Sequence, residues 1–169
     1  MKRQRGVTLL ELLIGMTLLG IVLGLGVPGF TEMNRHRQLV NHGNSVVGGI
    51  HFARSEAMRL GRPVSICGSS DGASCSAAGW ADGWIVFTDN GVLGNAPDVN
   101  QVLRSTPAIG NLTSAGQVHI RFTGAGLRDT VGGAGDQVIS LRRVDCGAGR
   151  ARSLAVSSAG RVTLSEADC

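Results

Sequence analysis

The sequence predicts an α+β protein in which one long N-terminal helix precedes a domain of antiparallel strands. An apolar run extends from Val7 to Val27, and apolar residues then keep a helical spacing as far as Leu60. Beyond Pro63 the pattern changes to short strand-like segments separated by glycine-containing turns. With 169 residues, the chain can hold this helix and one modest soluble domain.

The apolar run is about as long as a helix that crosses a bilayer, since residues 7–27 cover roughly 20 positions. Lys2, Arg3 and Arg5 precede it, and the positive-inside rule places them in the cytoplasm. Glu11 lies within the run, where burial of a carboxylate in lipid costs about 3 kcal/mol or more. Because such a residue is costly to bury, its presence indicates that Glu11 has a function. A secretory signal peptide would have a shorter apolar core and a clean cleavage site, and a plain anchor would not explain Glu11.

The segment 30–62 predicts that the helix continues beyond the apolar run. One stripe of residues recurs at steps of three and four: Val40, Gly43, Val47, Ile50, Ala53, Ala57 and Leu60. Gly48 and Gly49 weaken the helix, and Gly61 together with Pro63 ends it. This half of the helix is therefore amphipathic and is expected to pack along one stripe.

Residues 63–169 predict a β-rich domain. Its strand-like segments are Val64–Cys67, Trp84–Thr88, Gln101–Ser105, 118–122, Val138–Val144, Ser153–Ser157 and Arg161–Leu164. The last two are separated by Ser158–Ala159–Gly160, which predicts a hairpin. Trp80 and Trp84 flank the turn signal Asp82–Gly83, and we interpret both as core residues, the alternative being an exposed aromatic contact.

Composition and motifs give little support to charge-driven nucleic-acid binding or to catalysis. The formal net charge is +4, but Lys2, Arg3 and Arg5 supply three of these charges, and the other 13 basic residues face 12 acidic ones. The four histidines do not fall at metal-ligand spacing, and the sequence has no nucleophile elbow or phosphate-binding loop. We therefore expect neither an enzyme nor a bound cofactor, and interpret the histidines as surface or structural residues.

Four cysteines follow the apolar run: Cys67, Cys75, Cys146 and Cys169. An even number beyond a membrane segment predicts disulfides in an oxidising compartment, here the periplasm. Of the three pairings that four cysteines permit, we favour Cys67–Cys75, which closes a short loop, and Cys146–Cys169, which pins the C-terminus. A zinc site is the less favoured alternative, because the sequence has no CxxC pair and no histidine near these cysteines.

The N-terminal residues resemble those of type IV prepilins and pseudopilins, whose leader is cut after a glycine that precedes Phe and then Thr-Leu-(Leu/Ile)-Glu. The match covers Gly6, Thr8, Leu9, Leu10 and Glu11, whereas Val7 stands where Phe is usual. The resemblance implies a leader peptide over 1–6, a transmembrane and filament-core helix over 7–29, a periplasmic helix over 30–62 and a periplasmic domain over 63–169. It also implies cleavage after Gly6 by a prepilin peptidase and methylation of Val7.

Glu11 has a defined role in this interpretation. Cleavage after Gly6 would expose the Val7 amine at the start of an apolar helix. In a growing filament, Glu11 of an incoming subunit would pair with the terminal amine of its neighbour, because an unpaired acid in an apolar medium is penalised. The predicted role of Glu11 is therefore to drive assembly and to set the axial register.

Further strings resemble the FimT/GspH class of minor pilins and pseudopilins, so that the similarity spans nearly the whole chain. They are Ala53–Ala57, Val64–Cys67, Asp71–Cys75, Gly83–Phe87, Leu154–Ser157, Gly160–Val162 and the final cysteine. The resemblance implies a type IV pilin-like fold and a structural subunit of a type IV pilus or a type II secretion pseudopilus. The implied partners are other pilin subunits, the prepilin peptidase and the bacterial inner membrane, which a single-pass chain crosses with its C-terminal domain in the periplasm.

DNA binding at a pilus tip is the alternative function. Some FimT-like minor pilins bind DNA for natural transformation through a C-terminal Gly-Arg-x-Arg motif. Gly149–Arg152 fits these letters but precedes the penultimate strand, whereas Gly160–Thr163 is placed as in the family but has Thr163 for the second arginine. The candidate phosphate-binding residues are Arg150, Arg152 and Arg161. The competing interpretation is a solvated basic loop whose charge is offset by nearby acids.

Overall fold

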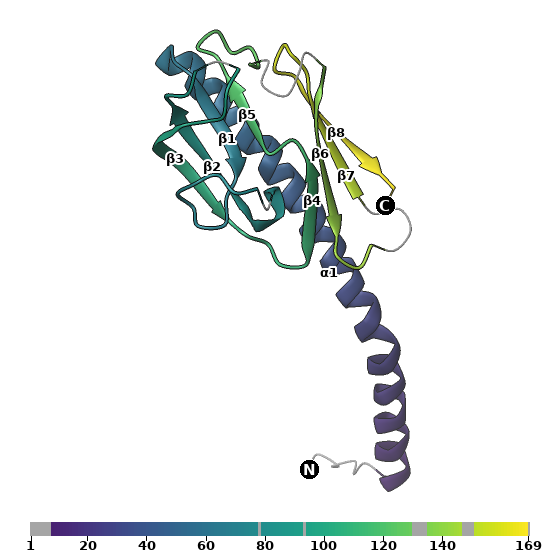
Figure 1. Ribbon diagram of the computed structural model, residues 1–169. Helices are drawn as coiled ribbons and strands as arrows, with labels where there is room; N and C mark the ends of the chain where they lie inside the picture. Colours follow the sequence, from purple (N-terminus) through teal and green to yellow (C-terminus); the bar gives the residue numbers. More distant parts are fainter. Residues whose placement is uncertain (1–7, 78, 93, 130–134, 147–150, 169) are drawn as a thin grey trace, which may run out of the picture. The chain divides into compact units, whose positions relative to one another are not determined.

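The computed structural model describes residues 8–77, 79–92, 94–129, 135–146 and 151–168 (Figure 1). Helix α1 (Leu9–Leu60) comes first and accounts for all of the described helix apart from the short 3-10 helix η1 (Trp80–Asp82). The chain divides into two compact units, Met1–Arg37 and Gln38–Cys169, which we call the N-terminal unit and the C-terminal unit. Each unit is described by itself below.

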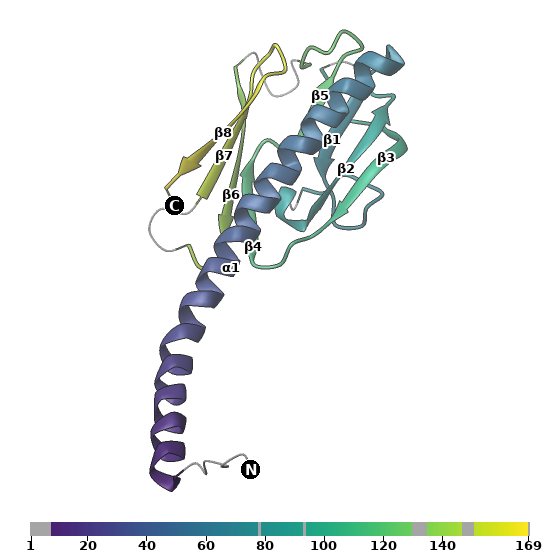
Figure 2. The same cartoon turned by 180° about the vertical axis from the view of Figure 1, so that it is seen from behind.

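The C-terminal unit contains two four-stranded antiparallel sheets. The first sheet has the order β3-β2-β1-β5 and consists of β1 (Val64–Gly68), β2 (Gly83–Asp89), β3 (Val99–Pro107) and β5 (His119–Phe122). The second sheet has the order β4-β6-β7-β8 and consists of β4 (Leu112–Gly116), β6 (Gln137–Arg143), β7 (Ala151–Val156) and β8 (Val162–Ala167). Figure 2 shows the last turns of α1 lying across these sheets.

One hydrophobic core joins α1 to both sheets of this unit. Its members include Leu39, Val46, Ile50, Ala53 and Ala57 from α1, Ile66, Trp84 and Ile120 from the first sheet, and Ile139, Leu141 and Leu154 from the second sheet. The predicted helical stripe is confirmed at Ile50, Ala53 and Ala57, which are fully buried. Nearer the start of this unit, Gly43 of the predicted stripe is buried, whereas Val40 and Val47 are only half-buried. The buried face there also includes Leu39, His42 and Val46.

The predicted strands all occur, and the structure adds one. The hairpin expected around Ser158–Gly160 is formed by β7 and β8, whose register pairs Val156 with Val162. Strand β4 escaped prediction because Leu112–Gly116 reads Leu-Thr-Ser-Ala-Gly, in which only Leu112 is both large and apolar. β4 forms the edge of the second sheet, and backbone pairing with β6 makes this segment a strand although its side chains do not alternate between apolar and polar.

The two adjacent glycines of α1 are expected to respond to alanine in opposite directions. A Cβ atom on Gly49 would lie 2.8 Å from Trp84 Cη2 and 2.9 Å from Ile66 Cδ1, whereas one on Gly48 would meet nothing within 4 Å. Gly48→Ala should raise the free energy of unfolding by about 0.5–1 kcal/mol, because alanine is the better helix former. Gly49→Ala should lower it by about 1–3 kcal/mol, because the buried Trp84 ring must move.

Urea denaturation of the full chain in detergent micelles, followed by circular dichroism, measures both changes. Gly48→Ala is the matched control, since it alters the same helix by the same methyl group on the exposed side. If both substitutions stabilised the protein, the Trp84 ring would not need the space that a glycine at position 49 leaves for it.

Candidate functional site

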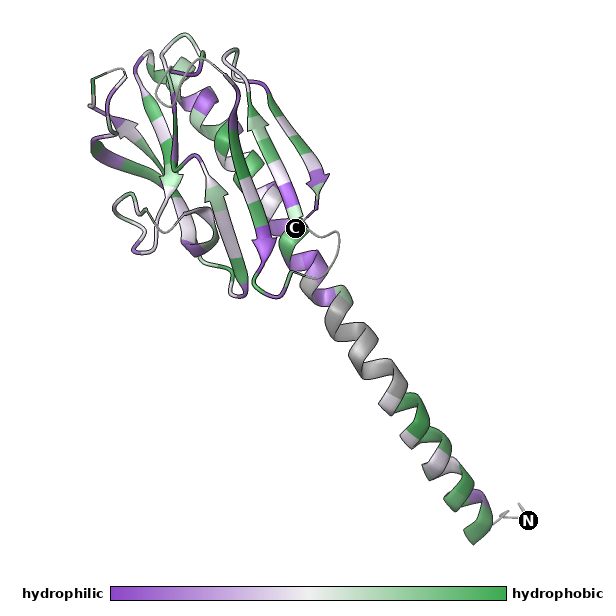
Figure 3. Ribbon diagram, turned by 45° about the vertical axis from the view of Figure 1, so that its right-hand side comes forward, coloured by the Kyte–Doolittle hydropathy of each residue, from purple (hydrophilic) through white to green (hydrophobic). Residues whose placement is uncertain are grey.

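The described start of α1 is an apolar helix with no covered face. Within the N-terminal unit, all side chains from Thr8 to Gly24 are exposed. The large apolar ones are between 51% and 81% exposed and comprise Leu9, Leu10, Leu12, Leu13, Ile14, Met16, Leu18, Leu19, Ile21, Val22 and Leu23 (Figure 3). Among the residues that the structure describes, no helical stretch has the length and apolarity required to span a membrane. A helix that is apolar on every side is covered by other apolar groups in its functional state.

Two polar residues mark the first turn of this helix. Thr8 is the N-cap, and the backbone amide of Glu11 donates a hydrogen bond to Thr8 Oγ1 at 3.3 Å. The spacing Thr8–Glu11 is that of a capping box, a signal visible in the sequence that our sequence interpretation missed. The Glu11 carboxylate is exposed and has no hydrogen-bond or ion-pair partner among the described residues. Its predicted partner segment, which includes Gly6 and Val7, lies outside the described residues.

The predicted disulfide between Cys67 and Cys75 is present, with an S–S distance of 2.07 Å. Within the loop that it closes, Asp71 accepts hydrogen bonds from the Ser74 side chain, from the Ser74 and Ala73 amides and from the Ser69 side chain. These bonds hold the pKa of Asp71 well below its usual value.

Cys146 is disulfide-bonded as well. Cys169 lies outside the described residues, so the pairing Cys146–Cys169 stays a prediction. Within the described ranges there is no group of three His, Cys, Asp or Glu side chains that could hold a metal ion. The structure therefore assigns Cys67 and Cys75 to a disulfide and leaves the second bridge to be tested.

Among the described residues, the candidate DNA-binding arginines do not form one patch. Arg152 Nη2 lies 3.1 Å from Glu166 Oε1, its register partner across the β7–β8 hairpin. Arg161 is exposed at the turn of this hairpin, about 15 Å along the strands from Arg152 at the usual rise per residue. Arg150 lies outside the described residues. The DNA-receptor hypothesis therefore stays a prediction.

A buried ionic cluster in the C-terminal unit was missed by sequence reasoning. Arg121 of β5 is 1% exposed; its Nε lies 2.8 Å from Asp89 Oδ2, and its Nη1 lies 3.3 Å from Asp129 Oδ2. Burial acts to raise the pKa of Asp89, but hydrogen bonds from Arg121, Ser65 and the amides of Asp98 and Gly91 outweigh it, so that the pKa lies below its usual value. Asp89 and Arg121 lie 32 positions apart, and no local spacing predicts that they meet.

The two tryptophans are core residues, as the sequence interpretation held. Trp80 is 1% exposed and Trp84 is fully buried. His42 of α1 is fully buried too, and its Nε2 donates a hydrogen bond of 2.8 Å to the carbonyl oxygen of Trp80. Burial lowers the pKa of His42, although its bond to the Trp80 carbonyl acts in the opposite direction. The interpretation of His42 as a structural histidine is therefore confirmed.

Two models of known protein families match this chain. A family model for the type II transport protein GspH matches residues 42–160. The chain belongs to this family. A second model, for the prokaryotic N-terminal methylation motif, matches residues 1–27 of this GspH-family chain, which include Gly6, Val7 and Glu11. The resemblance to the FimT/GspH class of minor pilins and pseudopilins is thereby confirmed.

Solved structures confirm the fold class of the GspH-family chain. The type IV minor pilin FimU of Pseudomonas aeruginosa is similar with a TM-score of 0.57 and 24% identity, over 80% of this chain and 92% of FimU. The minor pseudopilin EpsH of the type 2 secretion system of Vibrio cholerae is similar with a TM-score of 0.50 and 9% identity, over 76% of this chain and 97% of EpsH. A comparison with curated proteins found no match. At these identities the two structures show the shared fold, an α+β architecture of the type IV pilin kind.

Proposed function

We propose that this GspH-family chain is a non-catalytic structural subunit of a type IV pilus or of a type II secretion pseudopilus. A prepilin peptidase cuts the precursor after Gly6, and the new terminal residue Val7 is methylated. The apolar segment anchors the chain in the inner membrane, with the C-terminal unit in the periplasm. The subunit then enters or primes a filament together with other pilin subunits. The observation that carries this proposal is the uncovered apolar surface of α1 with a carboxylate at its start.

The energetics of that surface favour assembly. Burial of a large apolar side chain contributes about 1.5–3 kcal/mol relative to exposure, so covering the start of α1 by sister helices in a filament is strongly favourable. Glu11 would be buried by the same packing, and a buried carboxylate without a partner is destabilising. The amine that cleavage frees on Val7 of a neighbouring subunit is the complementary charge, and it lies on the same kind of helix.

The capping-box spacing offers a second explanation for Glu11, although the structure shows only the bond from the Glu11 amide to Thr8 Oγ1. Two substitutions separate the two roles. Glu11→Gln keeps an oxygen acceptor for the cap but removes the charge, and it should reduce incorporation into filaments at least tenfold, since about 1.4 kcal/mol corresponds to tenfold and a broken buried pair costs more. Thr8→Val removes the cap hydroxyl but keeps the carboxylate, and it should cost about 0.5–2 kcal/mol of helix stability with incorporation largely preserved.

The measurement is the amount of subunit in sheared, purified filaments relative to the amount in membranes, by quantitative immunoblot. Intact mass spectrometry of both variants serves as the control, because each must begin at Val7 if processing is unaffected. Wild-type incorporation of Glu11→Gln would refute the role of the charge. Equal loss of incorporation in both variants would show that the Thr8 cap matters as much as the charge, and the loss could then not be assigned to the charge alone.

A further inference from the structure

The segment between β2 and β3 is held in place by the buried ionic cluster of Asp89, Arg121 and Asp129. We call its described residues, 90–92 and 94–98, the β2–β3 loop. The three charged side chains bond to its backbone, at the amides of Gly91, Gly94 and Asp98 and at the carbonyl oxygens of Val92 and Ala96. The position of this loop therefore depends on the charges of the cluster.

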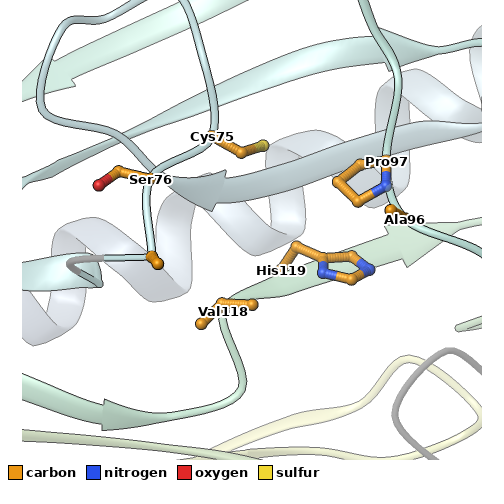
Figure 4. Close-up of a pocket in the computed structure, with 7 residues that line it drawn as sticks. Cys75, Ser76, Ala96, Pro97, Val118 and His119 are labelled. Carbon is orange, nitrogen blue, oxygen red and sulfur yellow. The ribbon is translucent and has the colours of Figure 1, made fainter.

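His119 of β5 lies next to this loop. It is the register partner of Cys67, which belongs to an apolar cluster separate from the core that contains α1. Register partners present their side chains on the same face of a sheet, so His119 is on this face too. Figure 4 shows its imidazole ring extending toward Ala96 and Pro97 of the β2–β3 loop. These residues and His119 line one pocket of about 290 Å³.

The imidazole of His119 is poorly placed to carry a proton while the loop is closed. The residue is 8% exposed, and its Nε2 atom is buried with no hydrogen-bond partner among the described residues. A protonated imidazole has an N–H group on both ring nitrogens, so Nε2 would become a buried donor without an acceptor. Such a donor costs free energy, and a charged one costs more than a neutral one.

The charges around His119 do not compensate for such a proton. Burial has the largest effect and lowers the pKa of His119, and the guanidinium of Arg121 lowers it further. Asp89 and Asp129 act in the opposite direction, but both carboxylates are already bonded to Arg121 and to loop amides. The residues with which the loops line the pocket carry no charge, since Cys75 is held in a disulfide.

We propose that His119 is a pH-sensitive switch, in which protonation of its imidazole releases the β2–β3 loop from the ionic cluster and opens the pocket to solvent. The imidazolium would attract Asp89 and Asp129 and repel Arg121, and this weakens the bonds that the cluster makes to the loop. Opening of the loop gives the charged ring access to water. The inference does not depend on filament assembly.

The direction of the pH dependence follows from the two forms of the loop. In the open form, the ring of His119 is solvated and titrates near the ordinary histidine pKa of about 6.5. In the closed form its pKa is lower, so the open form binds more protons as the pH falls. The closed form is therefore most favoured above about pH 6.5 and loses stability as the pH falls from there toward the pKa of the closed form.

The test is amide hydrogen exchange of the full chain in detergent micelles at about pH 7.5 and about pH 5, each rate divided by the intrinsic rate at that pH. The reporters are the Gly91, Gly94 and Asp98 amides. We expect their protection to be about tenfold lower at the acid pH, since each unit of pKa difference is tenfold in the opening constant. The amides of β7 should keep their protection. Unchanged protection of the loop amides, or an equal loss in β7 through global unfolding, would overturn the proposal.

Two histidine variants assign the effect. His119→Gln removes the titrating group but keeps a polar side chain, and it should abolish the pH dependence. His51→Gln is the matched control, because His51 is exposed on α1, and it should leave the pH dependence unchanged. A pH dependence that persists in His119→Gln would refute the switch.

If His119→Gln fails to fold, the wild-type chain still decides. Its histidine rings are labelled with ¹⁵N, and the titration of His119 is compared with the loss of protection at Gly91, Gly94 and Asp98. The proposal requires the two transitions to share one midpoint, and separate midpoints would overturn it. Neither result bears on the role of Glu11.

Discussion

Replacing Arg121 with methionine should lower the free energy of unfolding by about 3–5 kcal/mol, the usual cost of breaking a buried ion pair by removing one partner. The side chain of Arg121 is fully buried between Asp89 and Asp129. Arg121 also donates hydrogen bonds to the carbonyl oxygens of Val92 and Ala96. These bonds fix the segment between β2 and β3. Without Arg121, two carboxylates would remain in a poorly solvated site, and two loop carbonyls would lose their donor.

Guanidinium denaturation of the full chain in micelles measures this loss, with Arg161→Met as the control. Arg161 is exposed, so its substitution should change the free energy of unfolding by less than about 0.5 kcal/mol. The triple variant Arg121→Met, Asp89→Asn, Asp129→Asn should recover part of the lost stability, because it removes the uncompensated charges. A loss below about 1 kcal/mol for Arg121→Met would mean that water or a counterion replaces the guanidinium.

Trp80→Ala should cost about 3–5 kcal/mol, the range for a buried aromatic side chain. Trp80 lies where three elements meet: its amide donates to Ser114 Oγ of β4, its carbonyl oxygen accepts from His42 of α1, and its Nε1 donates to the Gln117 carbonyl oxygen at 2.6 Å. The backbone bonds survive the substitution, so the expected loss comes from the ring and its hydrogen bond. Trp80→Phe keeps most of the apolar volume and should cost clearly less than Trp80→Ala.

Thermal or urea unfolding monitored by circular dichroism compares these variants with Val144→Ala. Val144 is 67% exposed, so its truncation should leave the unfolding midpoint almost unchanged. If Trp80→Phe proves as destabilising as Trp80→Ala, the hydrogen bond to the Gln117 carbonyl would be the dominant contribution. If neither variant loses more than about 1 kcal/mol, Trp80 does not connect the sheets to the helix as the geometry indicates.

Local signals in the sequence account for most of the fold. The helical stripe at Ile50, Ala53 and Ala57 is periodic, and periodicity survives folding because it reflects which face is buried. The alternation around Ile120 located β5 but did not predict its burial, because all four residues of this strand are buried. Leu112–Gly116 carries no such pattern, and it becomes a strand only because β6 lies beside it. The division of the strands into two sheets also depends on pairing between distant segments, which one sequence does not reveal.

Among the candidate sites, too, only those built from neighbouring residues could be predicted from the sequence. The Gly6–Glu11 motif is contiguous, so the sequence alone could indicate assembly, although it did not reveal that Thr8 caps the helix. Arg121 meets Asp89 across 32 positions, and His119 acquires its pocket only when two loops are folded over the sheet. Arg152 looked like one of a group of basic residues, but its pairing with Glu166 depends on hairpin register.

The complete burial of both tryptophans in the C-terminal unit has a spectroscopic consequence. The chain has two tryptophans and no tyrosine, so its ultraviolet emission should come almost entirely from Trp80 and Trp84 and should lie toward the blue in the native state. The apolar start of α1 contributes no fluorophore, whether it is in a micelle or in a fibre. Any tyrosine emission from a complex would therefore identify the other protein.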